Sequence, residues 1–173
     1  MTTSRIKPLK LPKPPKLPSY ADLHREMAKV PPPAEDELAR IAVPWDPART
    51  CQNARPGHFQ ALGREMKAGQ TLAIYYWRLD RFQTDERVLV QWWVLRGRVM
   101  DQRNVEAGIK PVEDGLFRRK WNDGDGVTDD DSREYVETEF VRMLTGQSWA
   151  RNEWTIAVIR RHPVQPGKKG EKK

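Results

Sequence analysis

The sequence predicts an α+β fold in which one long helix packs on an antiparallel β-sheet, with the elements in the order β-β-β-α-β. Three observations lead to this class. Residues 71–82 and 87–100 are rich in β-branched and aromatic side chains, residues 131–144 carry apolar side chains at helical spacing, and residues 154–163 form an apolar run that ends in a proline. We expect residues 70–163 to form this core.

Residues 19–69, ahead of the core, are expected to be helical. Ser19 is suited to cap a first helix, and Tyr20, Leu23, Met27 and Val30 give that helix one apolar stripe before three prolines end it. A second helix is expected over residues 34–42, because three acidic residues occupy its first turn, where they interact favourably with the positive end of the helix dipole. A third is expected over residues 58–67, ending before Gly69.

The two strand-like segments are expected to pair as a long antiparallel hairpin, because the polar sequence QTDE separates them. Neighbouring side chains in a strand point to opposite faces, so only one of Trp92 and Trp93 is expected to face the main core. Trp92 shares its parity with Val88, Val90 and Val94, and we therefore predict that Trp92 is that residue.

Glycines and prolines indicate the boundaries of the remaining elements of the core. A loop containing Gly108, Pro111 and Gly115 is expected to lead into a third strand over residues 116–121. Residues 122–131 form an acidic loop rich in glycine. Asp131 or Ser132 then caps the long helix, and the final strand covers residues 154–163.

The positive charge of the chain is concentrated at its two ends. The whole chain has a net charge of +7, but its first nineteen residues hold five basic residues, five prolines and no acid. The last ten residues hold four lysines and one glutamate, which leaves 22 basic and 23 acidic residues, a net charge of −1, between residues 20 and 163. We expect residues 1–18 and 164–173 to be disordered basic tails, because neither buries enough apolar surface to offset the entropy of ordering.

Basic tails and strand-end arginines near tryptophans are typical of proteins that contact a nucleic-acid backbone. We therefore expect a non-enzymatic accessory protein that binds DNA or RNA, with low sequence preference, or a nucleoprotein assembly. The predicted contact residues are Lys7, Lys10, Lys13, Lys16, Arg96, Arg98, Arg118, Lys168 and Lys169. In the predicted meander, Arg96, Arg98 and Arg118 would lie in one patch.

Two other functions stay open. A protein-interaction adaptor, or a subunit of a larger complex, would dock through its tryptophan-rich surface or its proline-rich arm, where residues 12–15 match the minimal P-x-x-P pattern. A small metal-dependent hydrolase or nuclease would depend on the acidic loop. Read as a calcium loop from Asp123, that loop fails at Val127 and Thr128, which occupy positions that require a ligand and a glycine. A solvated turn explains the same acidic residues.

Several classes of protein are not expected from this sequence. A single cysteine, Cys51, excludes an intramolecular disulfide and a multi-cysteine zinc site. The apolar runs are too short to span a bilayer, and the basic N-terminal segment lacks the apolar stretch of a signal peptide. We expect no cofactor, no membrane partner and a cytoplasmic location.

Overall fold

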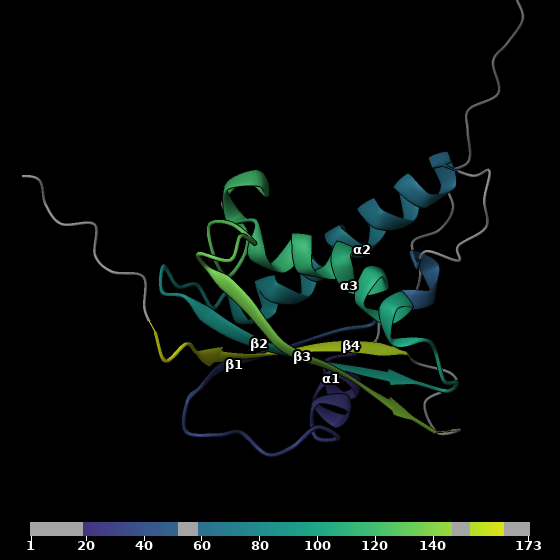
Figure 1. Cartoon of the computed structure of the whole chain (residues 1–173), viewed down its shortest axis with the longest axis horizontal. Helices are drawn as coiled ribbons and strands as arrows, with labels where there is room; N and C mark the ends of the chain where they lie inside the picture. Colours follow the sequence, from purple (N-terminus) through teal and green to yellow (C-terminus); the bar gives the residue numbers. More distant parts are fainter. Residues whose placement is uncertain (1–18, 52–58, 147–152, 165–173) are drawn as a thin grey trace, which may run out of the picture.

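The structure, a computed structural model, describes residues 19–51, 59–146 and 153–164. It has an α+β fold with one four-stranded mixed sheet and helices on both faces (Figure 1). In chain order the elements are α1 (Tyr20–Met27), β1 (Glu37–Val43), the 3₁₀ helix η1 (Pro47–Arg49), α2 (Phe59–Asp80), β2 (Val88–Arg96), α3 (Gln102–Phe117), the 3₁₀ helix η2 (Arg119–Trp121), β3 (Val136–Thr145) and β4 (Trp154–Arg161). The expected α+β class is confirmed.

The sheet has the strand order β1-β4-β2-β3. β4 is antiparallel to both β1 and β2, whereas β2 and β3 are parallel. The expected purely antiparallel sheet, with elements in the order β-β-β-α-β, is therefore wrong. Parallel neighbours need a long crossover, usually helical, and α3 provides it between β2 and β3.

The helix expected over residues 34–42 is wrong, because this segment contains β1. Ile41 is buried and pairs with Ala157 of β4. Asp36, which was expected in the first turn of a helix, instead accepts hydrogen bonds from Arg160 of β4, the shorter at 2.9 Å. Pairing with a distant strand therefore outweighs the local preference of acidic residues for a helix N-terminus.

The first strand of the expected hairpin is also wrong, because the helix expected over residues 58–67 continues to residue 80. Gly69, Ala73, Tyr76 and Trp77 are buried at positions i, i+4, i+7 and i+8, which form one helical stripe. Gly69 does not end α2. It lies in close contact with Pro111 of α3, where only a glycine leaves enough room.

The loop expected around Gly108, Pro111 and Gly115 is in fact the helix α3, and the strand expected over residues 116–121 is the last turn of α3 followed by η2. Gly108 meets η1 and Gly115 meets α2, so both glycines permit close packing of the helix. The helix buries an apolar stripe formed by Val105, Ile109, Val112 and Leu116.

The long helix expected after Asp131 or Ser132 is the edge strand β3 instead. It runs parallel to β2 from the pair Val88–Val136 to the pair Arg96–Thr145. Its sequence, VETEFVRMLT, is rich in β-branched and aromatic residues, which favour a strand, although its apolar positions have helical spacing. Pairing with β2 stabilises the strand.

Three local expectations are confirmed. α1 begins after Ser19, whose side chain accepts a hydrogen bond from the Asp22 backbone, while the Asp22 side chain accepts one from the Ser19 backbone. Residues 88–96 and 154–161 form strands β2 and β4, as expected for their segments. None of the helices in the described part of the chain has the length and apolar character that crossing a membrane requires.

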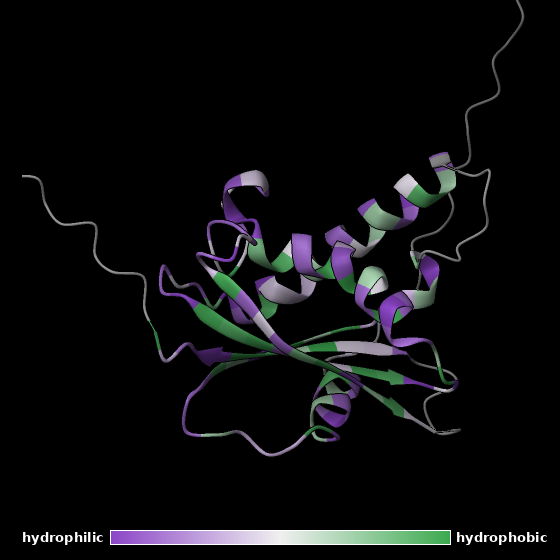
Figure 2. Cartoon of the chain, viewed as in Figure 1, coloured by the Kyte–Doolittle hydropathy of each residue, from purple (hydrophilic) through white to green (hydrophobic). Residues whose placement is uncertain are grey.

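The sheet has a covered face on each side. α2 and α3 lie on one face and α1 on the other (Figure 1), and the strands are largely hydrophobic (Figure 2). Trp92 faces the larger layer, where its ring meets Phe117 of α3 edge to face at 6.1 Å, as predicted. Trp93 is buried as well, at 5% exposure, because Phe140 and the segment at Pro31 cover the opposite face.

Candidate functional site

One face of α3 carries three charged side chains that are partly buried. Lys110, Glu113 and Asp114 stand at positions i, i+3 and i+4, so they lie on one face of the helix. Their apolar neighbours in sequence, Ile109 and Val112, are buried against the rest of the fold. The alternation of buried and charged positions therefore fixes the direction in which the three polar groups point.

The acidic loop, residues 122–131, folds back onto the C-terminal end of α3. The Asn122 side chain donates to the carbonyls of Asp114 and Gly115, at 3.0 and 3.1 Å. The Val127 backbone N–H donates to the Leu116 carbonyl at 2.6 Å, and the Val127 side chain is fully buried. The loop is thus bonded to the end of the helix, although Asp123 and Gly124 at its tip are exposed, and it brings Asp131 next to α3.

Five side chains form what we call the Lys110 cluster: Lys110, Glu113, Asp114, Arg118 and Asp131. The Lys110 Nζ atom lies 3.1 Å from Glu113 Oε2 and 3.1 Å from Asp114 Oδ1, and it also contacts Asp131 Oδ2. Arg118 lies beside them, with Nε at 3.4 Å from Asp131 Oδ1 and Nη1 at 3.7 Å from Asp114 Oδ1. Three carboxylates from a helix and a loop therefore converge on one ammonium group.

The cluster holds its charges in a partly desolvated environment. Burial opposes the charge of Lys110, but its bonds to Asp131, Glu113 and Asp114 outweigh burial and raise its pKa above the usual value. Burial raises the pKa of Glu113, although Lys110 opposes that shift. Among the described residues, Asp114 Oδ1 and Arg118 Nε are buried without a hydrogen-bond partner, despite their ion-pair contacts. The Asp114 carboxylate is therefore held at ion-pair distance from both Lys110 and Arg118.

A surface pocket of about 540 Å³ opens beside the cluster. Glu113 and Asp131 line it together with two arginines, Arg87 and Arg133, and with the first residues of β3. Its volume is within the usual range for small-molecule sites. The pocket therefore places carboxylates and guanidinium groups around a space large enough for part of a nucleotide.

The basic residues predicted from the sequence do not form the expected patch. Arg96 lies at the end of β2, with only 9% of its side chain exposed, and its Nε is 2.9 Å from Asp46 Oδ1. Arg118 lies near Asp131, just before β3, and β3 begins beside the opposite end of β2. Arg98 is exposed in the loop after β2. The six predicted lysines, Lys7, Lys10, Lys13, Lys16, Lys168 and Lys169, lie outside the described residues.

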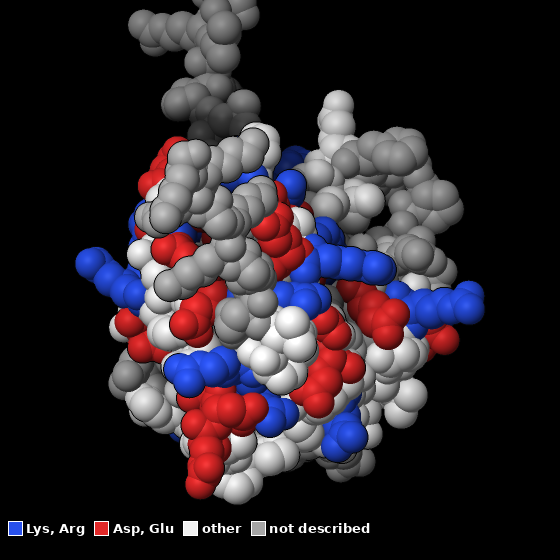
Figure 3. All heavy atoms as spheres, turned by 60° about the vertical axis from the view of Figure 1, so that its left-hand side comes forward, with Lys and Arg blue, Asp and Glu red and all other residues white. Residues whose placement is uncertain are grey.

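One face of the molecule shows how the surface charges are distributed. On the face shown in Figure 3, lysines and arginines alternate with aspartates and glutamates. Arg119 pairs with Asp129, and Lys120 with Asp130 at 2.8 Å, so each basic residue after α3 meets an acid of the loop that follows. The helices α2 and α3 cover one face of the sheet. On the opposite face the exposed Arg142 lies over the rings of Phe140 and Trp93, at 5.1 and 5.3 Å from their centroids, so the basic and aromatic contact that the sheet does offer is made by residues outside the predicted set.

Sequence reasoning identified the acidic loop and Arg118 but missed Lys110, Glu113 and Asp114. The signal for these three was their i, i+3, i+4 spacing, which places them together only on a helix. Gly108 and Pro111 indicated a loop, and in a loop this spacing does not bring the three side chains together.

A second acidic group lies at the other end of the sheet. Glu153 and Asp46 both approach Arg96, whose Nε is 3.8 Å from Glu153 Oε1. Burial raises the pKa of Glu153 to about 7, and a hydrogen bond and repulsion from Asp46 add to the shift, while Arg96 opposes it. Glu153 therefore keeps its proton to higher pH than an ordinary glutamate does.

This pair predicts a pH dependence of stability. Because the pKa of Glu153 in the folded chain exceeds its ordinary value of 4.5, its contribution to stability is fully present below pH 4.5 and is lost as pH rises to about 7. Glu153→Gln keeps a hydrogen-bonding side chain without titrating. We expect the variant to gain stability relative to the parent chain between pH 5 and pH 8, measured by urea unfolding. A constant difference between the two proteins over this range would contradict the assignment.

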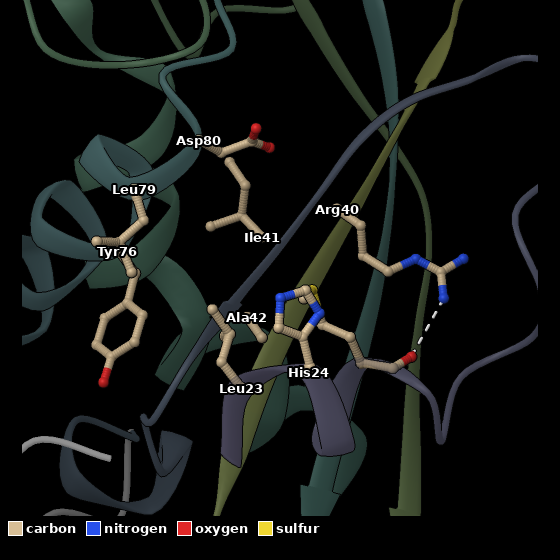
Figure 4. A pocket seen from close by; sticks show the side chains of 9 residues that line it. Leu23, His24, Arg40, Ile41, Ala42, Tyr76, Leu79 and Asp80 are labelled. Carbon is tan, nitrogen blue, oxygen red and sulfur yellow. Dashed lines mark hydrogen bonds between the residues drawn. The ribbon is translucent and has the colours of Figure 1, made fainter. Parts of the chain in front are cut away.

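A smaller pocket, of about 190 Å³, lies between α1, β1 and the end of α2 (Figure 4). Leu23, Ile41 and Leu79 line it, and Arg40 donates to the Met27 carbonyl at 3.3 Å. Arg40 is also paired with Glu37 at 2.7 Å, so its charge is engaged within the fold. We therefore interpret this pocket as a packing gap where α1 contacts the sheet.

No preformed metal centre is present among residues 19–51, 59–146 and 153–164, because no group of three or more His, Cys, Asp and Glu side chains there is arranged to hold an ion. Asp125 pairs with Arg78, away from the Lys110 cluster. Comparison of the chain with protein-family models, with curated proteins and with solved structures finds no match.

Proposed function

We propose that this chain associates with nucleic acid and hydrolyses phosphodiester bonds at the Lys110 cluster with the help of a divalent cation. The observation that supports the proposal is the convergence of the Glu113, Asp114 and Asp131 carboxylates on Lys110 Nζ, beside a pocket whose wall combines two arginines with acidic side chains. Carboxylates bind the cation and basic side chains bind the phosphate in metal-assisted phosphoryl chemistry.

The donor set fits a hard cation. Mg²⁺ takes oxygen ligands and is usually held by one or two carboxylates, with waters and substrate phosphates completing its coordination. Asp114 and Asp131 supply two such groups from different elements, and a cation bound between them would replace Lys110 Nζ, which lies 3.1 Å from Asp114 Oδ1 and also contacts Asp131. A site of this kind does not need a preformed set of three protein ligands.

The basic residues have a defined place in this chemistry. A bound cation polarises a phosphoryl oxygen and lowers the pKa of a coordinated water. Lys110 Nζ lies among these carboxylates, so it would be next to a phosphate oxygen of a substrate bound there. The exposed Arg133, on the wall of the pocket, would contact an adjoining phosphate, whereas Arg87 on the same wall is already paired with Glu137 at 2.6 Å.

A polymeric substrate agrees with the charge of the whole chain. The lysine-rich segments at both ends, which lie outside the described residues, suit contact with a phosphate backbone without base readout. The proposal keeps the expected nucleic-acid partner and replaces the non-enzymatic role with the hydrolase alternative. Binding without turnover would restore the accessory role, and capture of a protein by residues 12–15 would favour the adaptor.

The experiment is a cleavage assay with the full chain. Labelled single-stranded, duplex and branched DNA, and RNA, are incubated with Mg²⁺ or Mn²⁺ and then with excess chelator. We expect cleavage that requires the metal and falls to background in Asp131→Asn. The matched control is Asp123→Asn, an exposed acid of the same loop whose positive φ of 54° suits asparagine. The control is expected to retain activity.

Two further readouts make the result decisive. Thermal unfolding shows whether Asp131→Asn is folded, and Mn²⁺ titration followed by electron paramagnetic resonance shows whether the ion is lost. Cleavage that survives chelation, equal loss in both variants, or no turnover on any substrate would each refute the proposed site.

A further inference from the structure

One tryptophan differs from the others in its surroundings. Trp121 has 66% of its surface exposed, whereas Trp45, Trp77, Trp92, Trp93 and Trp154 are at most 5% exposed. An exposed indole sacrifices the large stabilisation that burial of an aromatic side chain gives. Among the described tryptophans, Trp121 is thus the one that contributes little to the core and is available to a ligand.

The ring stands on a firmly anchored turn. Trp121 ends η2, and the next residue, Asn122, is buried. The Asn122 side chain accepts a hydrogen bond from Gln70 of α2 at 2.9 Å and donates to two carbonyls of α3. The Trp121 backbone N–H donates to the Arg118 carbonyl at 2.8 Å. A ligand therefore meets an aromatic side chain whose backbone is already fixed by two helices.

Two cations lie next to the ring. Arg118 Cζ and Lys120 Nζ lie over the ring, each 5.8 Å from its centroid, and Lys120 is also paired with Asp130 at 2.8 Å. Arg118 also belongs to the Lys110 cluster, where its Nε is 3.4 Å from Asp131 Oδ1. One guanidinium therefore links the exposed ring to the proposed phosphate site.

From this arrangement we infer that Trp121 is a stacking platform for an unpaired base of the nucleic acid whose backbone occupies the Lys110 cluster, an inference that rests on the proposed function. Flanking cations next to an aromatic face suit a nucleotide, which offers a π-face and a phosphate together. A protein ligand is less favoured, because the chain after Trp121 is polar and exposed, with Asp123 and Gly124.

The test measures binding without cleavage. The full chain is titrated with a fluorescent single-stranded oligonucleotide in chelator, and anisotropy gives the affinity. Removal of a base–aromatic stack weakens binding about five- to 150-fold, so Trp121→Ala is expected to show a loss in that range. Trp121→Phe should recover most of it. The matched control is Tyr75→Ala, which removes another exposed aromatic ring, 46% exposed, and should change the affinity less than twofold.

An oligonucleotide of equal length with abasic sites isolates the stacking contribution. It should bind the parent chain more weakly than the intact strand does, and it should bind Trp121→Ala and the parent chain alike. Equal loss for intact and abasic strands would mean that Trp121 acts through structure or charge, and would overturn the inference, as would absence of oligonucleotide binding by the parent chain. Metal-dependent cleavage is read separately, so stacking without cleavage refutes only the hydrolase, and cleavage without a Trp121 effect refutes only the platform.

Discussion

Replacement of Trp92 by alanine is expected to lower the free energy of unfolding by about 3–5 kcal/mol, the usual cost of deleting a large aromatic side chain from a core. Trp92 is fully buried in the central strand β2 and contacts Phe117 of α3 edge to face. The substitution therefore opens a cavity between the sheet and its larger helical layer. Urea unfolding followed by circular dichroism measures the change.

Two variants bracket this expectation. Trp92→Phe retains a ring beside Phe117 and removes an indole N–H that has no hydrogen-bond partner in the described chain, so it should recover most of the loss. Trp121→Ala, at the exposed platform, should change stability by no more than about 0.5 kcal/mol. If Trp93→Ala proves more destabilising than Trp92→Ala, the face toward α1 is the main core.

Two glycine-to-alanine substitutions are expected to have opposite signs. Alanine favours a helix over glycine by about 1 kcal/mol, and in α2 a Cβ at Gly63 would meet nothing within 4 Å, so Gly63→Ala should stabilise the fold by roughly that amount. In α3, a Cβ at Gly108 would lie 2.2 Å from the Pro47 carbonyl oxygen and 2.6 Å from the Pro47 Cβ.

Gly108→Ala should therefore destabilise the fold by about 1–3 kcal/mol or more, because backbone on both sides must move. The Gly108 carbonyl also accepts hydrogen bonds from Trp45 Nε1 at 2.9 Å and from Thr50 Oγ1 at 3.1 Å, and displacement of α3 would weaken both. Thermal unfolding of the two variants and the parent chain measures the difference. A Gly108→Ala protein as stable as Gly63→Ala would show that α3 does not approach η1 so closely.

These glycines also explain which parts of the fold were predictable. The cap at Ser19 and the strands β2 and β4 were found because residues close in sequence determine them. Gly69, Gly108 and Gly115 act as packing surfaces between helices, and a sequence alone does not distinguish this role from that of a helix terminator. The β-branched and aromatic residues of α2 likewise resemble a strand until the buried stripe is known.

The candidate site was predictable only in part, for a related reason. Asp131 and Arg118 stand out in the sequence because each lies in a run of like charges. Lys110 and Asp114 are recognisable as site residues only once residues 102–117 are known to be helical, because the helix places them on one face. The contact of Lys110 with Asp131 depends in addition on the path of the loop back over α3. A contact between residues 21 positions apart leaves no local pattern.

The position of β3 at the edge of the sheet affects the tendency of this chain to aggregate. An edge strand offers unpaired backbone groups to which a second chain can add. β3 exposes charged side chains at Glu137, Glu139 and Arg142, and its Val141 carbonyl already accepts a hydrogen bond from Gln102 of α3 at 3.0 Å. Strand addition here would bury charge and break that bond, so this edge of the sheet is protected against edge-to-edge aggregation.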